Sequence, residues 1–178
     1  MSRLTNLRPG ESSSLRRSSQ TFSDFGSCDE ELAADIGPLE VTGSYISHLM
    51  CWRDLDVMLL VGADYGPQDV LRLISQIMEL PGVVGFDYRD ERADRSPTGE
   101  VSDERYHVPI LLERAAGIWR LDLSLWLHDI HDNVTAWHQE LRNKITDEQR
   151  AAVLRIKDVW FRLPSYPMGS VASRSIPL

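Results

Sequence analysis

The sequence contains little cysteine, little lysine and no long uninterrupted run of apolar residues. Its two cysteines, Cys28 and Cys51, lack a CxxC spacing and lie in segments predicted to differ in structure. This pattern indicates neither a closed zinc site nor a disulfide framework. Without a long apolar segment or a hydrophobic N-terminal region, the sequence predicts no transmembrane helix and no secretory signal. We therefore expect a cytoplasmic protein that does not bind a membrane.

Positive charge is in deficit, because 27 acidic residues outnumber 19 basic ones and give a formal net charge of -8. Such a charge repels polyanions, so nucleic acid is not an expected partner. Nearly all basic residues are arginine, with Lys144 and Lys157 as the exceptions. We interpret this skew as a coding bias and not as a signal for phosphate binding. A neutral or cationic acceptor, or a nucleotide whose charge is offset by metal, remains compatible with the acidic chain.

A length of 178 residues with 42% hydrophobic content suits one domain with flanking tails. Residues 1–27 are polar and rich in serine, which predicts a disordered leader. Residues 28–130 are predicted to form the main domain, and 131–163 a helical hairpin that packs on it. Residues 164–178, rich in Pro, Ser and Gly, are predicted to be an irregular tail.

Hydrophobic periodicity predicts an α/β (α+β) fold with a mixed sheet flanked by helices. Pro109 favours an edge position for its strand, and the charged stretch 89–105 is predicted to be a long exposed connection. Thr146 and Gln149 have the spacing of a capping box, which starts the last helix. We predict strands over 39–41, 55–61, 83–88, 106–112 and 119–127, and helices over 29–37, from Pro67 to Pro81, over 133–144, and from Thr146 to before Pro164.

Three aspartates are placed where they can act together. Asp54 and Asp56 are two residues apart at the start of a buried strand, so their carboxylates project from the same face. Asp122 lies in a strand with strict alternation, on the face opposite the leucines. Adjacent carboxylates at the margin of a core are unfavourable unless a cation lies between them, and Mg²⁺ prefers such hard oxygen ligands.

The turn before these aspartates has the features of a phosphate site. Gly43 allows the backbone to approach a phosphate closely, and Ser44 offers hydroxyl and amide hydrogen bonds where a following helical turn leaves N–H groups available. With two Mg²⁺ ions on the aspartates, about 3.5–4 Å apart, such a site would activate an acceptor hydroxyl and offset the charge on a departing pyrophosphate.

The stretches VTGS, WRDLDVMLLV and WRLDLSLWL together resemble the nucleotidyltransferase superfamily of DNA polymerase beta-like enzymes. In that family a Gly-Ser turn precedes an Asp-x-Asp strand, and a third carboxylate lies on a later strand. The resemblance covers about residues 38–127, and the helices that follow resemble the helical region that often completes the acceptor site. The short, acidic chain is most similar to the minimal and antibiotic-modifying members.

The resemblance implies a nucleotidyltransferase-like mixed sheet with a C-terminal helical hairpin. Gly43 and Ser44 would bind the phosphates of an NTP such as ATP. Asp54, Asp56 and Asp122 would be the catalytic residues and the ligands of two Mg²⁺ ions, with Asp122 holding a metal or receiving the proton of the attacking hydroxyl. The implied reaction is transfer of a nucleoside monophosphate to a hydroxyl of a small molecule or a protein, with release of pyrophosphate.

A second hypothesis is a catalytically silent nucleotidyltransferase-like module that binds nucleotide or a partner protein, as an antitoxin-like subunit would. The Arg-Gly that often follows the Gly-Ser turn in the family is replaced here by residues 45–48, Tyr-Ile-Ser-His. The chain also ends soon after one helical hairpin, so a homodimer or a partner protein could complete the acceptor site. Release of pyrophosphate distinguishes the two hypotheses.

Removal of residues 1–27 tests the predicted leader. Because this segment lacks the apolar periodicity needed to dock on a domain, we expect the truncated protein to keep its melting temperature and its affinity for nucleotide. A thermal melt of both proteins measures this, and a large loss of melting temperature in the truncated protein would contradict the prediction.

Overall fold

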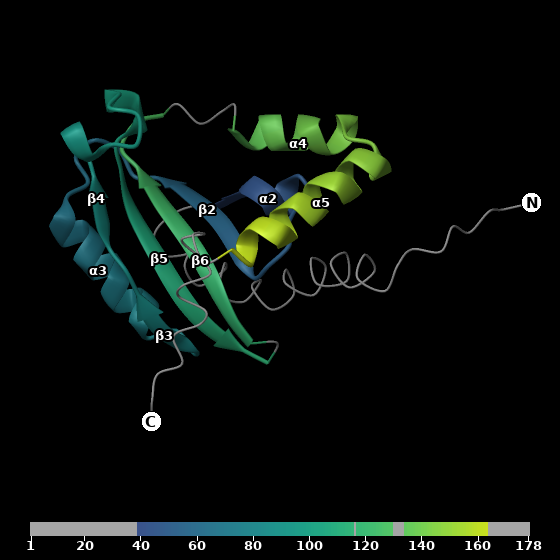
Figure 1. The fold of residues 1–178 in the computed structure, drawn as a ribbon. Helices are drawn as coiled ribbons and strands as arrows, with labels where there is room; N and C mark the ends of the chain where they lie inside the picture. The colour runs from purple at the N-terminus through teal and green to yellow at the C-terminus, as the bar shows by residue number, and fades with distance from the viewer. Residues whose placement is uncertain (1–38, 116, 130–133, 164–178) are drawn as a thin grey trace, which may run out of the picture.

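The computed structural model describes residues 39–115, 117–129 and 134–163. They form a mixed α+β fold around a six-stranded sheet, with the strand order β1-β2-β6-β5-β3 and with β4 also paired to β5 (Figure 1). This confirms the predicted α+β class with a mixed sheet flanked by helices. The predicted leader, the predicted helix over 29–37 and the predicted tail over 164–178 lie outside the described residues.

Most of the predicted elements are present with small shifts at their ends. The strands are β1 (Glu40–Thr42), β2 (Asp54–Leu60), β3 (Val83–Phe86), β4 (Arg89–Glu91), β5 (Arg105–Arg114) and β6 (Gly117–Trp126). The helices are α2 (Gly43–Ile46), α3 (Pro67–Met78), α4 (Val134–Lys144) and α5 (Asp147–Phe161), with two 3-10 turns, η1 (Ala93–Arg95) and η2 (Val101–Asp103). In the part of the chain that the structure describes, no helix is both long and apolar enough to cross a membrane.

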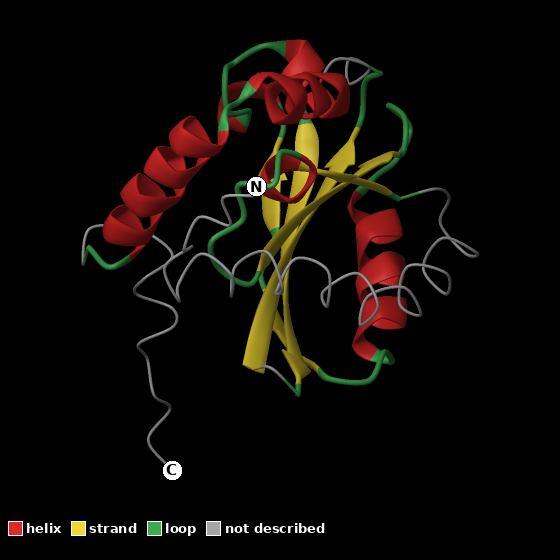
Figure 2. Ribbon diagram, turned by 90° about the vertical axis from the view of Figure 1, so that its right-hand side faces the viewer, coloured by secondary structure: helices red, strands yellow, loops and turns green. Residues whose placement is uncertain are grey.

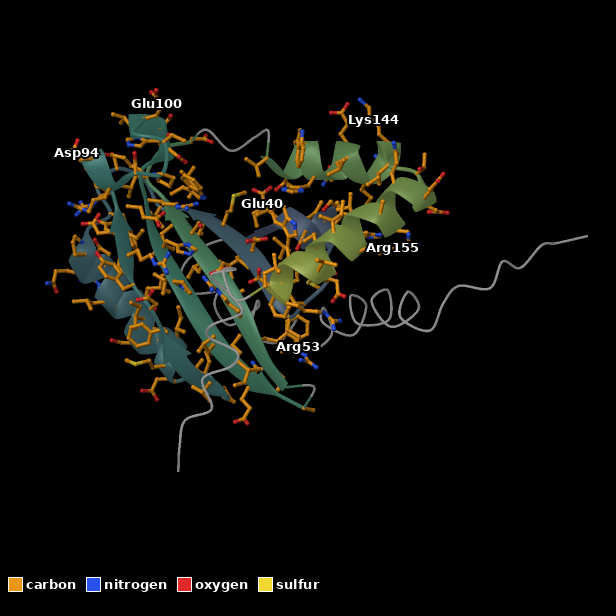
Figure 3. The ribbon with its side chains drawn as sticks, in the orientation of Figure 1. Glu40, Arg53, Asp94, Glu100, Lys144 and Arg155 are labelled. Atoms are coloured by element: carbon orange, nitrogen blue, oxygen red, sulfur yellow. The ribbon has the colours of Figure 1, made fainter. Side chains whose placement is uncertain are left out.

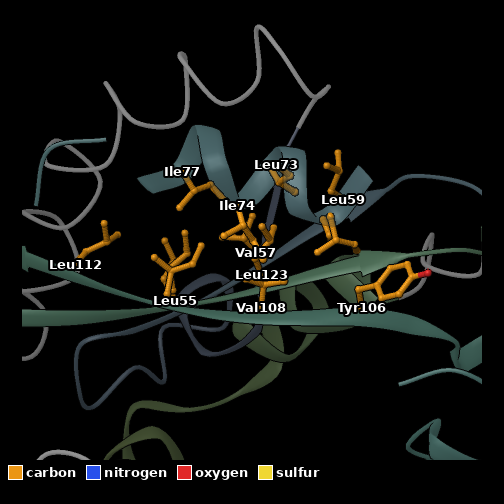
Figure 4. Close-up of a cluster of buried hydrophobic side chains, with 14 of the residues drawn as sticks. Leu55, Val57, Leu59, Leu73, Ile74, Ile77, Tyr106, Val108, Leu112 and Leu123 are labelled. Atoms are coloured by element: carbon orange, nitrogen blue, oxygen red, sulfur yellow. The ribbon is translucent and has the colours of Figure 1, made fainter. Parts of the chain in front are cut away.

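The hydrophobic core fills the space between α3 and one face of the sheet. Pro67 starts α3, and the helix buries an apolar stripe of Val70, Leu73, Ile74 and Ile77. Alternate residues of β2, β5 and β6 meet this stripe, as Figure 4 shows for Leu55, Val57 and Leu123. The helices α2, α4 and α5 lie on the other side of the sheet (Figures 1 and 2). The polar face of the strands is therefore turned toward the helical hairpin.

The pairing of β2 with β6 is parallel, whereas β1 with β2 and β5 with β6 are antiparallel. In this register Asp56 lies beside Thr42 on one side and Asp122 on the other, and Asp54 lies beside Arg120. Residues at the same register position present their side chains on the same face. The sheet therefore brings the predicted acidic residues together.

The prediction that Pro109 marks an edge strand is wrong, because β5 lies between β6 and β3 in the interior of the sheet. Pro109 pairs with Asp122 of β6, and its carbonyl accepts a hydrogen bond from the Asp87 amide at 2.8 Å. Asp87 lies in the interruption between β3 and β4. The missing N–H of Pro109 thus faces a break in the neighbouring strands, where no ladder hydrogen bond is lost.

The stretch 89–105 is more ordered than the sequence predicts. Its first residues form β4, which pairs with β5, and η1 and η2 follow. Ion pairs hold the stretch together: Arg92 Nε lies 2.7 Å from Asp90 Oδ1, and Arg105 Nε lies 2.6 Å from Glu91 Oε2. Alternating charge indicates solvent exposure from sequence alone, but here opposite charges are matched across the segment.

The predicted capping box of α5 is confirmed. Thr146 Oγ1 accepts a hydrogen bond from the Gln149 amide at 3.2 Å, and the Gln149 side chain accepts one from the Thr146 amide at 3.0 Å. The cap follows α4 after one residue, so α4 and α5 form the predicted helical hairpin. Figure 3 shows Lys144 at the turn of this hairpin, and Asp94 and Glu100 at the far end of the molecule over η1 and η2.

The turn from β1 into α2 lies directly against Asp56. Gly43 has φ +66°, a conformation that favours glycine, and a Cβ atom there would lie 2.0 Å from Asp56 Oδ2. Gly62 also has a positive φ, +86°, but a Cβ atom there would meet nothing within 4 Å. Both glycines therefore adopt a positive φ, but only Gly43 lacks space for a Cβ atom.

Replacing Gly43 by Ala should therefore destabilise the protein more than replacing Gly62 by Ala. Each substitution costs about 1–2 kcal/mol for the left-handed backbone, and Gly43→Ala additionally displaces the Asp56 carboxylate. Urea unfolding of both variants measures the difference, and in an Asp56→Ala background the excess should shrink. If both variants lose the same free energy of unfolding, the Gly43 turn does not contact Asp56 closely enough to affect stability.

Candidate functional site

Three acidic side chains meet on the sheet face opposite α3. Asp54 and Asp56 come from β2, and Asp122 comes from the parallel strand β6. The alternation of β6 buries Leu121, Leu123 and Leu125 in the core, and this directs Asp122 to the other face. The structure thus places all three predicted acidic residues in one cluster.

Burial and mutual repulsion raise the pKa values of the aspartates on β2. For Asp54, burial and then the charge of Asp122 raise the pKa to about 7, against a hydrogen bond from Trp52 that lowers it. Burial and Asp122 also raise the pKa of Asp56, whereas a hydrogen bond from the Ser44 amide and the charge of Lys157 lower it. The fold therefore disfavours the charged form of these carboxyl groups relative to exposed aspartates, and a cation beside them would offset this.

Asp122 is restrained by two basic side chains. Arg120 Nε donates a hydrogen bond to Asp122 Oδ1 at 2.8 Å, and His107 Nε2 lies 3.5 Å from the same oxygen. His107 Nδ1 in turn lies 3.5 Å from Ser124 Oγ. Burial lowers the pKa of His107, and Asp122 opposes this shift. Because one oxygen of Asp122 holds both partners, the orientation of its carboxylate is fixed.

The Gly-Ser turn predicted to bind phosphate is joined to the acidic cluster. The Gly43 backbone lies directly against the Asp56 carboxylate, and the Ser44 amide donates a hydrogen bond to that carboxylate. The Ser44 carbonyl accepts a hydrogen bond from the Leu49 amide at 2.8 Å, which closes the short helix α2. The amide and the carbonyl of Ser44 are therefore both used within the fold.

The oxygen donors of the cluster fit Mg²⁺ bound partly through substrate. Asp54 Oδ1 is buried and has no hydrogen-bond partner among the described residues, although Asp54 Oδ2 accepts one from Trp52. Within the described ranges, no group of three or more His, Cys, Asp or Glu side chains is arranged to hold a metal ion by itself. Mg²⁺ is commonly held by one or two carboxylates, with phosphate oxygens and water completing the shell. Asp54 and Asp56 provide such a pair.

Besides Arg120 and His107, the side chains of Trp52 and Lys157 lie at the site although the sequence did not predict them there. Trp52 Nε1 donates to Asp54 Oδ2 at 3.1 Å, and Lys157 Nζ lies 4.8 Å from the centre of the Trp52 ring. Burial lowers the pKa of Lys157, while Cys51, Asp56 and Asp54 act in the opposite direction. Lys157 is one of two lysines in an arginine-rich chain, and this rarity was the available signal.

No protein-family model and no curated protein sequence matches this chain. Solved structures to which it is similar include small alarmone synthetase 1 from Bacillus subtilis bound to its product pppGpp, at 13% sequence identity and a TM-score of 0.37, with 89% of this chain and 100% of that chain covered. A GTP pyrophosphokinase family protein from Streptococcus pneumoniae is similar at 10% identity and a TM-score of 0.34, with 82% of this chain and 89% of that chain covered. At these TM-scores the likeness assigns neither a family nor an activity to this chain.

Proposed function

We propose that the chain transfers a nucleoside monophosphate from an NTP to an acceptor hydroxyl and releases pyrophosphate. The observation that carries this proposal is the register of β1, β2 and β6, in which Thr42, Asp56 and Asp122 form one row and the Gly43-Ser44 turn follows Thr42 directly. A phosphate contact beside carboxylates on a rigid sheet is what metal-assisted phosphoryl-group chemistry requires.

Each residue has a distinct part in this proposal. Asp54 and Asp56 would hold Mg²⁺, which would supply Lewis-acid polarisation of the reacting phosphate and offset the charge on pyrophosphate. The Ser44 hydroxyl would donate to the phosphates beyond the reacting one. Asp122 would receive the proton of the acceptor hydroxyl at Oδ2, since Oδ1 is engaged by Arg120 and His107.

The silent binding module remains the second candidate function. The ion pair between Arg120 and Asp122 favours it, because an arginine that neutralises the third carboxylate removes part of the need for metal. The same ion pair also orients Asp122 for a proton transfer. Only a product measurement separates these two interpretations.

A product assay with α-labelled NTPs and candidate hydroxyl acceptors tests the reaction. We expect label on the acceptor together with free pyrophosphate, both dependent on Mg²⁺ and both lost in Asp56→Asn. Release of labelled nucleoside monophosphate without free pyrophosphate, and with no label on the acceptor, would instead mean attack at the β-phosphorus and transfer of the pyrophosphoryl group to the acceptor. Tight nucleotide binding with no turnover would support the silent module.

Replacing Asp56 by Asn separates the stability of the site from its function. Without metal, the variant should be equally stable or slightly more stable, because burial and Asp122 disfavour the Asp56 charge. The parent should gain about 2.7 kcal/mol from Mg²⁺ with NTP at a ligand concentration of about 100 times the dissociation constant, and the variant should gain nothing. Thermal melts with and without Mg²⁺ and each NTP measure both effects.

The matched control is Asp94→Asn, which removes one exposed negative charge on η1, at the far end of the molecule (Figure 3). This variant should keep the full stabilisation by nucleotide, so a loss in both variants would reflect net charge alone. Strong destabilisation of the metal-free protein by Asp56→Asn would show that the carboxylate is a structural acceptor for the Ser44 amide. Absence of any nucleotide effect on the parent would overturn the proposed function.

A further inference from the structure

Trp52 connects the first aspartate of β2 to the C-terminal helix. The residue lies two positions before Asp54, in the loop that leads into β2, and its indole N–H donates to Asp54 Oδ2 at 3.1 Å. A donor on one carboxylate oxygen fixes the rotation of the group and leaves the other oxygen directed elsewhere. Asp54 Oδ1 is that other oxygen, and it is buried without a partner among the described residues.

The position of the indole is itself set by α5. The Phe161 ring stacks on Trp52 with centroids 4.8 Å apart and an angle of 13° between the planes. Lys157 Nζ lies 4.8 Å from the Trp52 ring centre and donates to the Leu49 carbonyl at 2.8 Å. Lys157 and Phe161 are four residues apart, so they project from the same face of α5.

Further contacts hold α5 against the same loop. Arg150 Nη1 donates to the Ser47 carbonyl at 2.8 Å and to the His48 carbonyl at 3.2 Å. Cys51 Sγ lies 3.6 Å from the Leu154 carbonyl. Because α5 contacts this loop along its length, the loop before β2 and the helical hairpin form one supported unit.

We propose that Trp52 is a positioning residue that aims Asp54 Oδ1 at the metal, and that α5 fixes Trp52 through Phe161 and Lys157. The inference rests on the proposed function for the identity of the metal site. It assigns the helical hairpin a direct part in building that site, in addition to any contact with an acceptor. If Trp52 only packed against α5, its aromatic ring would be sufficient. If it orients the Asp54 carboxylate, its indole N–H is also required.

The first test uses electron paramagnetic resonance to measure the binding of Mn²⁺ alone to the parent chain and to the Trp52→Phe variant. Phenylalanine keeps an aromatic ring for Phe161 and Lys157 and removes the donor. We expect Mn²⁺ affinity to fall by about 10-fold or more, which is typical when a group that orients a metal ligand is lost. The matched control is Trp160→Phe on the exposed side of α5, which should bind Mn²⁺ as the parent does. Unchanged affinity in Trp52→Phe would overturn the proposal.

The second test uses the metal-free protein and needs no folded Trp52 variant. The chain has five tryptophans, so its ¹⁵N–¹H spectrum contains five indole signals that can be assigned in the parent. Asp54→Asn should shift the Trp52 indole signal and leave the Trp160 signal in place. An unmoved Trp52 signal would show that the hydrogen bond is absent and would overturn the proposal.

The third test concerns α5. Phe161→Leu keeps the indole N–H and the charge of Lys157 but removes the stacked ring, so Mn²⁺ affinity should fall by a smaller factor than in Trp52→Phe, with the Trp52 signal displaced. Full Mn²⁺ affinity in Phe161→Leu would overturn the part assigned to the helix. A parent chain that binds no Mn²⁺ yet shows the Asp54-dependent indole shift would instead refute the proposed function and keep the Trp52–Asp54 contact.

Discussion

Parallel pairing of β2 with β6 places Asp56 beside Asp122 on a sheet whose opposite face is filled by the core. The hydrophobic residues that alternate with these aspartates fix the register, because a slip of one residue would turn the carboxylates into the core. Core packing therefore enforces the proximity of like charges. Burial and then the repulsion from Asp122 raise the pKa values of Asp54 and Asp56, and this is the constraint to which the surrounding residues respond.

Hydrogen-bond donors and cations on separate elements offset this repulsion. The Ser44 amide donates a hydrogen bond to Asp56, Arg120 donates one to Asp122, and the Trp52 indole donates one to Asp54. Each acid therefore accepts at least one hydrogen bond, and Asp54 Oδ1 is still left without one among the described residues. A polar cluster that is partly satisfied in this way is unfavourable for stability alone, which is the pattern expected where function and stability compete.

The helical hairpin has no fully buried residue in α4 or α5, yet it is anchored to the loop before β2 by several specific contacts. Arg150 and Lys157 both donate to backbone carbonyls of residues 47–49. Such contacts fix position more than they bury apolar area, because a half-buried cation requires defined acceptors. The hairpin is thus held in register with the acidic cluster even though it contributes little to the core.

The sequence by itself determined the features that repeat within one element. The alternation of β6 separated Asp122 from the leucines, Pro67 marked the start of α3, and the spacing of Thr146 and Gln149 gave the cap of α5. Only the tertiary structure decided which elements meet. Pro109 lies in an interior strand because the break between β3 and β4 faces its missing N–H. Trp52 and Lys157 join the site because residues about a hundred positions apart are brought together by packing, and no local periodicity encodes such a pairing.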